Sequence, residues 1–238
     1  MKSFGIHSLI LATLLLQACV VDLGDHHRHH HHHDRPSGQR GHWGAACSAD
    51  FHCKDGLVCF SGVCEPERVG IYVHGALVAP GRADGMEWDA PYAVPHSTWI
   101  ELGNARRGGV DALFRFMDSV ARAGYSAPDV FGFAYMAVDG RWDDRLTISL
   151  GPTRRDSFEA IWTRPAGWTD VPFHEDLWIA VDLFDEDRDG DESIGLVEID
   201  AWGLREALHL GGVVWFDAFD ATEGQLLLLG IEMVSESW

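Results

Sequence analysis

The sequence predicts a mainly β protein: an antiparallel sandwich of about eight strands with one inserted helix, preceded by a small disulfide-stapled module. Two observations predict this class. Short apolar or alternating segments recur from residue 69 onward and are separated by Gly, Pro and Asp. Four of the five cysteines lie between Cys47 and Cys64. The rest of the chain must therefore fold by burying apolar side chains, for which its 46% hydrophobic content is ample.

Residues 1–18 have the pattern of a secretory signal peptide. Lys2 gives a positive start, and the apolar stretch over residues 6–16 is shorter than the roughly 20 residues that span a bilayer. The sequence LQAC, ending at Cys19, resembles the lipobox of bacterial lipoproteins. That resemblance implies that Cys19 carries lipid such as palmitate and anchors the mature chain in the outer membrane, facing the periplasm or the cell surface. An ordinary cleaved signal with an incidental cysteine is the other interpretation.

Residues 19–42 are expected to form a flexible tether. The stretch GDHHRHHHHHD is rich in histidine, and RPSGQRG follows it with nothing to bury. The imidazoles could bind zinc, nickel or copper, or the tract could be a low-complexity spacer.

Residues 43–66 are expected to form a Cys-rich module. An even, clustered set of cysteines in an exported chain predicts two disulfides, and the sequence leaves their pairing open. The four residues are Cys47, Cys53, Cys59 and Cys64. Zinc binding is the alternative. It is disfavoured because no C-x-x-C spacing is present and because the expected compartment is oxidising.

Residues 67–238 are expected to form the sandwich. Its strands are predicted over residues 70–79, 129–138, 144–150, 158–162, 176–184, 194–199, 212–216 and 225–234. One segment has helical spacing instead: Val110, Leu113, Phe114, Met117 and Val120 share a face before Gly124. This predicts a helical insertion over about 104–124 that packs its apolar stripe on the sandwich.

The charge excludes some partners. With 37 acidic and 18 basic residues, the chain has a formal charge of −19. Nucleic-acid phosphates are neutralised by clustered Lys and Arg, so we expect no nucleic-acid partner. Constitutive binding to anionic lipid is disfavoured for the same reason, because so acidic a surface needs cations before it approaches anything negative.

The acidic stretch LFDEDRDGDESIG, residues 183–195, is the most specific feature of the chain. Its Asp-x-Asp-x-Asp-Gly order matches the start of an EF-hand loop, but position 12 is Leu196 and the preceding residues alternate as a strand. With its flanking strands, the stretch resembles instead the third calcium loop of the C2 domain, a calcium-dependent phospholipid-binding β-sandwich. Weaker similarities to that family extend over most of residues 69–235.

The resemblance implies a set of Ca²⁺ ligands. Asp185 and Asp187 take the place of the paired aspartates of the third loop, and Glu192, with Asp191 as a substitute, takes the place of its last acid. The first loop would contribute Asp89 and Asp129, with Asp84 in reserve, although the predicted helix lies between them. Calcium takes six to eight oxygen ligands at about 2.4 Å. Neighbouring carboxylates also repel one another unless a cation pairs them.

These features predict a lipid-anchored module that binds a membrane phospholipid, a protein or a surface ligand when calcium is present. Two alternatives remain. The acidic loop could be only solvated in a metal-independent interaction or structural protein. A hydrolase could use scattered histidines (His74, His96, His174 and His209), but no nucleophile elbow, HExxH or P-loop is present, so we expect no enzyme.

Overall fold

The computed structural model describes residues 40–138, 141–142, 146–187 and 190–236. The expected signal peptide, Cys19 and nearly all of the tether lie outside the described residues. Within the described part of the chain, no helix is long and apolar enough to cross a membrane.

The Cys-rich module is a hairpin with a short helical turn. The 3-10 turn Asp50–His52 precedes β1 (Leu57–Phe60), which pairs antiparallel with β2 (Val63–Pro66). Both turn residues between these strands have left-handed backbone angles, at φ 45° for Ser61 and 85° for Gly62, as a tight two-residue hairpin requires. Disulfides join Cys47 to Cys59 and Cys53 to Cys64. The two predicted disulfides are therefore present, and the pairing that the sequence left open is resolved.

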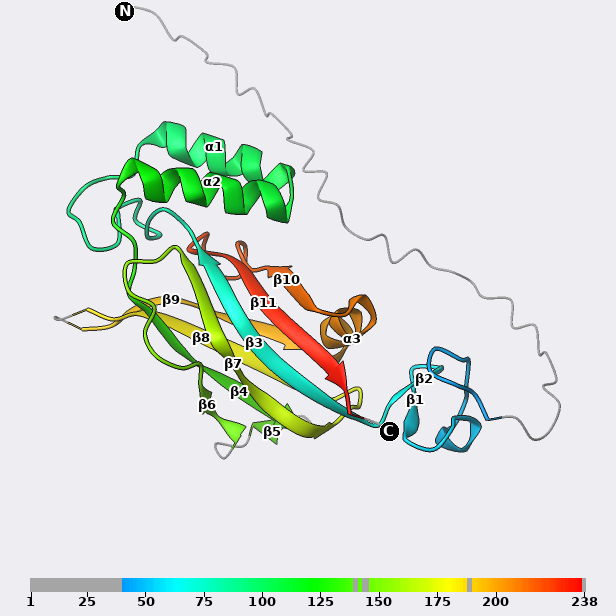
Figure 1. The fold of residues 1–238 in the computed structure, drawn as a ribbon. Helices are drawn as coiled ribbons and strands as arrows, with labels where there is room; N and C mark the ends of the chain where they lie inside the picture. Colours follow the sequence, from blue (N-terminus) through cyan, green and yellow to red (C-terminus); the bar gives the residue numbers. More distant parts are fainter. Residues whose placement is uncertain (1–39, 139–140, 143–145, 188–189, 237–238) are drawn as a thin grey trace, which may run out of the picture. The chain divides into compact units, whose positions relative to one another are not determined.

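Two antiparallel sheets form the main domain (Figure 1). One sheet has the order β10-β11-β3-β7, with β10 (Val213–Asp217), β11 (Leu226–Ser235), β3 (Arg68–Val78) and β7 (Glu159–Pro172). The other has the order β5-β4-β8-β9, with β5 (Arg141–Trp142), β4 (Val130–Val138), β8 (Trp178–Asp185) and β9 (Glu192–Asp200), and β6 (Ile148–Ser149) pairs with β4. The mainly β class and the antiparallel sandwich are confirmed.

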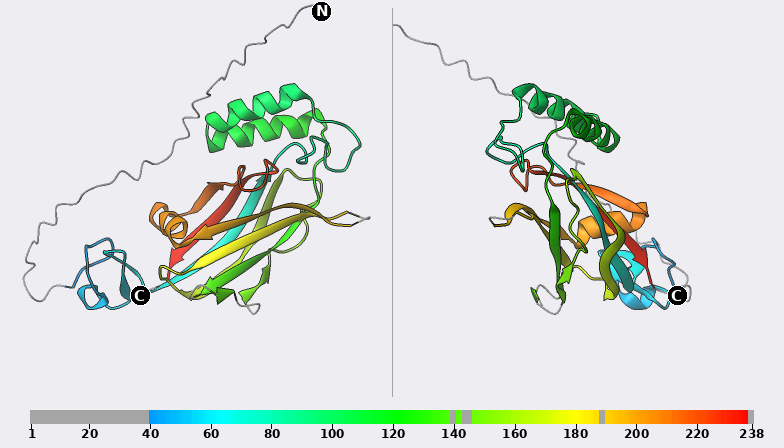
Figure 2. Two further views of the ribbon diagram at one scale, coloured as in Figure 1. Left: turned by 180° about the vertical axis from the view of Figure 1, so that it is seen from behind. Right: turned by 60° about the vertical axis from the view of Figure 1, so that its left-hand side comes forward.

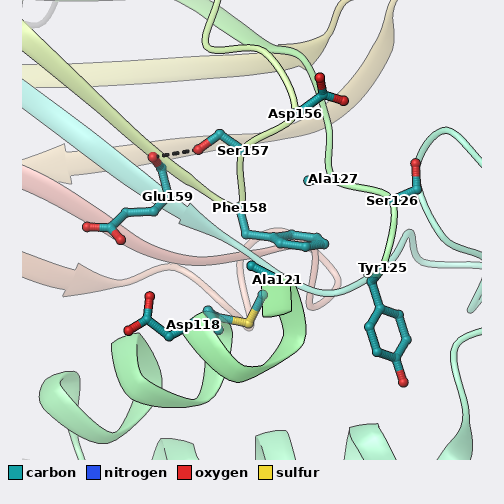
Figure 3. A pocket seen from close by; sticks show the side chains of 10 residues that line it. Asp118, Ala121, Tyr125, Ser126, Ala127, Asp156, Ser157, Phe158 and Glu159 are labelled. Atoms are coloured by element: carbon teal, nitrogen blue, oxygen red, sulfur yellow. Dashed lines mark hydrogen bonds between the residues drawn. The ribbon is translucent and has the colours of Figure 1, made fainter. Parts of the chain in front are cut away.

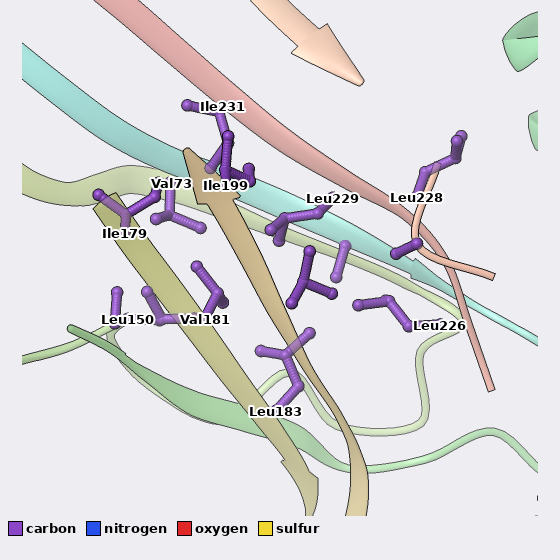
Figure 4. Close-up of a cluster of buried hydrophobic side chains, with 14 of the residues drawn as sticks. Val73, Leu150, Ile179, Val181, Leu183, Ile199, Leu226, Leu228, Leu229 and Ile231 are labelled. Atoms are coloured by element: carbon purple, nitrogen blue, oxygen red, sulfur yellow. The ribbon is translucent and has the colours of Figure 1, made fainter. Parts of the chain in front are cut away.

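The core lies between these sheets. Along β8, Ile179, Val181 and Leu183 are fully buried and alternate with outward-facing residues, as expected for a strand with one face in the core. Figure 4 shows them beside Leu229 and Ile231 of β11. Burying such side chains stabilises the fold by about 1.5–3 kcal/mol each.

Within the described residues, three α-helices accompany the sandwich (Figure 2). The insertion that was expected to hold one helix over about 104–124 contains two: α1 (His96–Arg107) and α2 (Val110–Ala123). The chain reverses between them at Gly108 and Gly109, and Gly109 has φ 81°. The predicted stripe of α2 does pack inward, with Leu113, Met117 and Val120 buried.

The third helix, α3 (Ala201–Leu210), follows β9 directly and was not expected. Its N-cap is Asp200, whose side chain accepts a hydrogen bond from the backbone N–H of Gly203 at 2.9 Å. The apolar side chains of Ala201, Leu204 and Ala207 are buried at helical spacing.

Strand lengths also differ from expectation. The segment expected as a short strand over 158–162 continues as the 14-residue β7. Of the strand expected over 144–150, the described residues contain the two-residue β6. The sandwich has nine strands in the part of the chain that the structure describes, rather than about eight, and β5 and β6 have two residues each.

Candidate cation site

The site is built from loops that meet at one end of the sandwich. Asp185 is the last residue of β8 and lies opposite Val130, the first residue of β4. The loop from β8 to β9 begins there, and the long connection that carries the helices ends at Asp129. The sheet register thus brings Asp129 and Asp185 together, although 56 positions separate them.

A β-bulge shapes the end of the acidic loop. Leu183 pairs with Gly195 and Phe184 with Ser193, which leaves Ile194 as the extra residue of β9. Gly195 has φ 144°, and a Cβ atom there would lie 2.5 Å from Cγ2 of Thr222. The Ile-Gly that closes the acidic stretch is therefore a requirement of this bulge, because only glycine fits both the angle and the space.

Asp185 is a buried carboxylate with an unsatisfied oxygen. The side chain is 0% exposed. Its Oδ1 accepts a hydrogen bond from the backbone N–H of Asp129 at 2.6 Å, while its Oδ2 is buried and has no hydrogen-bond partner among the described residues. An unpaired buried oxygen on a charged group is costly, and such groups in proteins are normally paired or coordinate a metal.

Three carboxylates converge at this point. Asp89, Asp185 and Asp187 each offer an oxygen, and these oxygens lie within 4.8 Å of one another. Two ligands on one calcium ion, each at about 2.4 Å, are at most about 4.8 Å apart. The spacing of these three oxygens therefore lies within the range that ligands of one calcium ion can span.

The helical insertion leaves Asp89 at the base of its loop. Trp88, buried beside it, donates its indole N–H to the carbonyl oxygen of Ala79 at 2.9 Å. On the far side of the insertion, Ser126 donates its backbone N–H to Glu87 at 2.8 Å, and its hydroxyl accepts the backbone N–H of Asp89 at 3.2 Å. These bonds join the two ends of the insertion, so the helices form an excursion that does not displace Asp89.

The pKa values of two of these carboxyl groups are raised by burial and by their negative neighbours. Burial raises the pKa of Asp185 to about 7, with further increases from the charges of Asp89, Asp187 and Asp129 and an opposing effect from the hydrogen bond of Asp129. Burial likewise raises the pKa of Asp89 to about 6, and Asp187 is the main neighbouring charge. Without a counter-ion the cluster holds its negative charge unfavourably.

The remaining predicted ligands lie around the cluster but outside it. Asp129 accepts the backbone N–H of Asp156 at 2.8 Å and acts electrostatically on Asp89 and Asp185. Asp191 is exposed. The reserve residue, Asp84, accepts the backbone N–H of Met86 at 2.9 Å. Of the predicted ligands, the group of three therefore contains Asp89, Asp185 and Asp187. It does not contain Asp84, Asp129, Asp191 or Glu192.

Glu192 is bound to a residue that sequence reasoning missed. Arg82 donates from Nη1 to both carboxylate oxygens of Glu192, at 2.7 and 2.8 Å. The same guanidinium lies 3.6 Å from Asp84 and interacts electrostatically with Asp187. The sequence did contain a signal for this pair, because Arg82 is the one basic residue in the acidic segment GRADGMEWD.

A cleft lies near Asp156 (Figure 3), whose charge acts on Asp89 of the cluster. Its volume is about 380 Å³, and it lies between α2 and the segments 125–127 and 156–159. Its polar lining includes Asp118, Asp156 and Glu159, and Ser157 donates its hydroxyl to the carbonyl oxygen of Glu159. None of the four histidines weighed for hydrolysis lines this cleft.

No family model matches the sequence, and no curated protein matches it. Several solved structures are similar to it in shape. Human GIVD cytosolic phospholipase A2, in complex with an inhibitor and terbium chloride, has 13% identity and a TM-score of 0.37 over 71% of this chain and 17% of that one. A calcium-bound pair of C2 domains from extended-synaptotagmin 2 has 15% identity and a TM-score of 0.37 over 71% of this chain and 46% of that one.

BON1-C2B has 12% identity and a TM-score of 0.32 over 70% of this chain and 89% of that one. The chain spans less than half of the phospholipase and extended-synaptotagmin structures that it matches. Similarity at this level does not identify a ligand or an activity, so the function proposed below rests on the residues of the site.

Proposed function

We propose that the sandwich is a C2-like calcium-binding module, displayed by a lipid-anchored exported protein, that binds an anionic ligand only when calcium is present. The observation that carries this proposal is the buried Asp185. Its Oδ2 has no partner in the part of the chain that the structure describes, and its carboxylate lies beside those of Asp89 and Asp187. A divalent cation would pair all three carboxylates at once.

The residues assign the roles. Asp185 and Asp187 would hold calcium from the β8 side, and Asp89 would hold it from the first loop. Calcium would supply the positive charge that this acidic face lacks, and an anionic lipid headgroup could then complete the coordination. Asp129 would position Asp185 through its backbone N–H and add negative charge nearby.

Calcium binding is tested by thermal unfolding of the full chain. A ligand at about 100 times its Kd stabilises the folded state by about 2.7 kcal/mol. For a domain of this size that corresponds to a rise in Tm of about 5–10 °C. The double variant Asp185→Asn plus Asp187→Asn should show no rise, and Asp118→Asn, an exposed acid on α2, should behave as the parent chain. An unchanged Tm with calcium would favour the metal-independent interaction protein.

Ligand binding is tested with vesicles. The Cys19→Ala chain, which lacks the proposed lipid, should sediment with vesicles that contain phosphatidylserine when calcium is present. It should stay in solution with EGTA or with phosphatidylcholine alone. Calcium-dependent stabilisation without sedimentation would leave a protein or another anionic surface as the ligand.

The anchor is a separate part of the proposal. Cys19 would carry the lipid, so a Cys19→Ala variant expressed in a bacterium should lose incorporation of labelled palmitate and leave the membrane fraction. Retention of label in that variant would contradict the anchor without affecting the calcium site.

A further inference from the structure

The outer face of the second sheet is aromatic. Phe131, Phe133 and Tyr135 alternate along β4 with buried residues, so their side chains lie on the face away from the core. The same alternation places Asp182 and Phe184 on this face of β8.

The aromatic rings form a contiguous group. Phe131 stacks on Phe184, with ring centroids 5.4 Å apart, and meets Phe133 edge to face at 6.2 Å. Phe133 is 36% exposed, and Leu196 on β9 is 47% exposed. Apolar side chains on three adjacent strands therefore remain in contact with water.

A single carboxylate lies in the middle of this group. Asp182 is paired in register with Phe133 on one side and with Leu196 on the other, and Phe184 follows two residues later on the same face. Burial by these neighbours raises the pKa of Asp182, and its charge adds to the effect of burial in raising the pKa of Tyr135. In the described part of the chain, Asp182 has no hydrogen-bond or ion-pair partner.

The charge of the face is one-sided. The strands β4, β8 and β9 contain no Lys, Arg or His, while β9 adds the exposed Glu198 to Asp182. Along these three strands an anionic ligand would meet carboxylates and no basic side chain. A cation, by contrast, could pair with Asp182 and also lie against the rings, whose faces are electron-rich.

Asp182 is also unfavourable for the fold. A partly buried carboxylate with a raised pKa opposes folding at neutral pH, and a neutral residue at this outward position would be less costly. A bound cation would supply the counter-charge that Asp182 lacks among the described residues.

We propose that the β4-β8-β9 face binds arginine side chains of a basic partner segment, with Asp182 as the counter-ion and Phe133 and Phe184 as the aromatic surface. Arginine suits this surface better than lysine because its planar guanidinium stacks on rings while it donates hydrogen bonds to a carboxylate. The site is independent of calcium, since it uses none of the three clustered aspartates.

The proposal is tested with a fluorescent hexa-arginine peptide and the full chain, measured by fluorescence anisotropy at about 0.15 M salt. Asp182→Asn and Phe133→Leu should each weaken binding about tenfold. Phe133→Leu keeps the apolar character of the side chain and removes only the ring, so it separates cation–π contact from general hydrophobic contact. Both positions face outward, and unfolding curves verify that the variants are folded.

Two matched controls decide the outcome. Asp118→Asn removes an exposed acid from α2 and should change binding by less than twofold. Asp185→Asn removes a clustered acid and should also leave hexa-arginine on the sheet. Equal losses in the three Asp→Asn variants, with none in Phe133→Leu, would show non-specific attraction to an acidic protein and overturn the proposal, as would equal binding of a neutral peptide. A loss confined to Asp185→Asn would overturn it in favour of the loops.

Discussion

The guanidinium of Arg82 binds both carboxylate oxygens of Glu192 and so joins the connection after β3 to the start of β9. Asp89 lies on that connection, and Asp187 lies in the loop that leads into β9. This places a positive charge beside the acidic cluster. It also means that Glu192, one of the predicted ligands, is already paired with Arg82.

Replacing Arg82 by Gln should tighten calcium binding by about tenfold or more. The bridge is partly exposed, at 26% and 40% for its two side chains, and such pairs contribute at most about 1 kcal/mol. The guanidinium also acts electrostatically on Asp187, so its positive charge would repel a divalent ion held there. Isothermal calorimetry would measure the change, with the exposed Arg122→Gln as the control. Weaker binding would show that the bridge positions the loops.

Without calcium, the stability of the chain should fall as the pH rises from about 4 to about 7. The pKa of Asp185 is about 7 in the folded chain against 3.8 as its ordinary value. Over that range the folded state holds a proton that the unfolded state has lost, so folding is favoured at the acid end. Melting curves in EGTA at pH 5 and pH 7.5 would measure this effect.

The Asp185→Asn variant isolates that contribution. Its Tm in EGTA should exceed that of the parent chain at pH 7.5 and should vary less with pH. If the parent chain and the variant showed the same pH dependence, the raised pKa would have to be assigned to another group.

Glu65 should be a main determinant of the attachment of the Cys-rich module to the sandwich. Its carboxylate is 0% exposed and accepts hydrogen bonds from Trp43 at 2.8 Å, Arg205 at 2.7 Å and His209 at 2.9 Å. Glu65→Gln should reduce the free energy of unfolding by about 2 kcal/mol, because Arg205 loses its buried counter-charge. Urea unfolding would measure it, and the exposed Glu67→Gln should have little effect. Faster proteolysis within residues 40–66 should accompany the loss.

Gly195→Ala should destabilise the chain by about 2 kcal/mol or more. The left-handed backbone and the 2.5 Å approach to Thr222 both disfavour a side chain at the bulge. Gly103 in α1 is a matched control, since a Cβ there meets nothing within 4 Å, and Gly103→Ala should stabilise by about 0.5–1 kcal/mol. Denaturant midpoints of the two variants should therefore move in opposite directions.

The strands of the sandwich could be predicted because their buried and exposed residues alternate with period two, as in β4 and β8. Helix α1 could not, because its apolar residues do not form a stripe: Leu102 is buried while Ile100 is 55% exposed. Helix α3 has a cap at Asp200 and helical spacing. It was still missed, because it is short and lies between the strands β9 and β10, whose apolar patterns are clear.

The candidate site was partly predictable for a different reason. Asp185 and Asp187 lie two residues apart in a recognisable loop, and the structure brings Asp89 near them. The ion pair between Arg82 and Glu192 joins residues that are 110 positions apart in the sequence. No local sequence pattern predicts such a contact. The same holds for the bonds between residues 87–89 and Ser126 that keep Asp89 beside the cluster.

Strand β3 connects the Cys-rich module to the end of the sandwich where the acidic loops lie. It begins at Arg68, directly after the disulfide-linked hairpin, and ends at Val78, from which the chain continues to Asp89 (Figure 1). Eleven residues of strand extend over about 36 Å. The acidic loops therefore lie at the opposite end of the sandwich from the point where the chain enters it. A ligand at the acidic loops would therefore lie a strand's length away from the Cys-rich module.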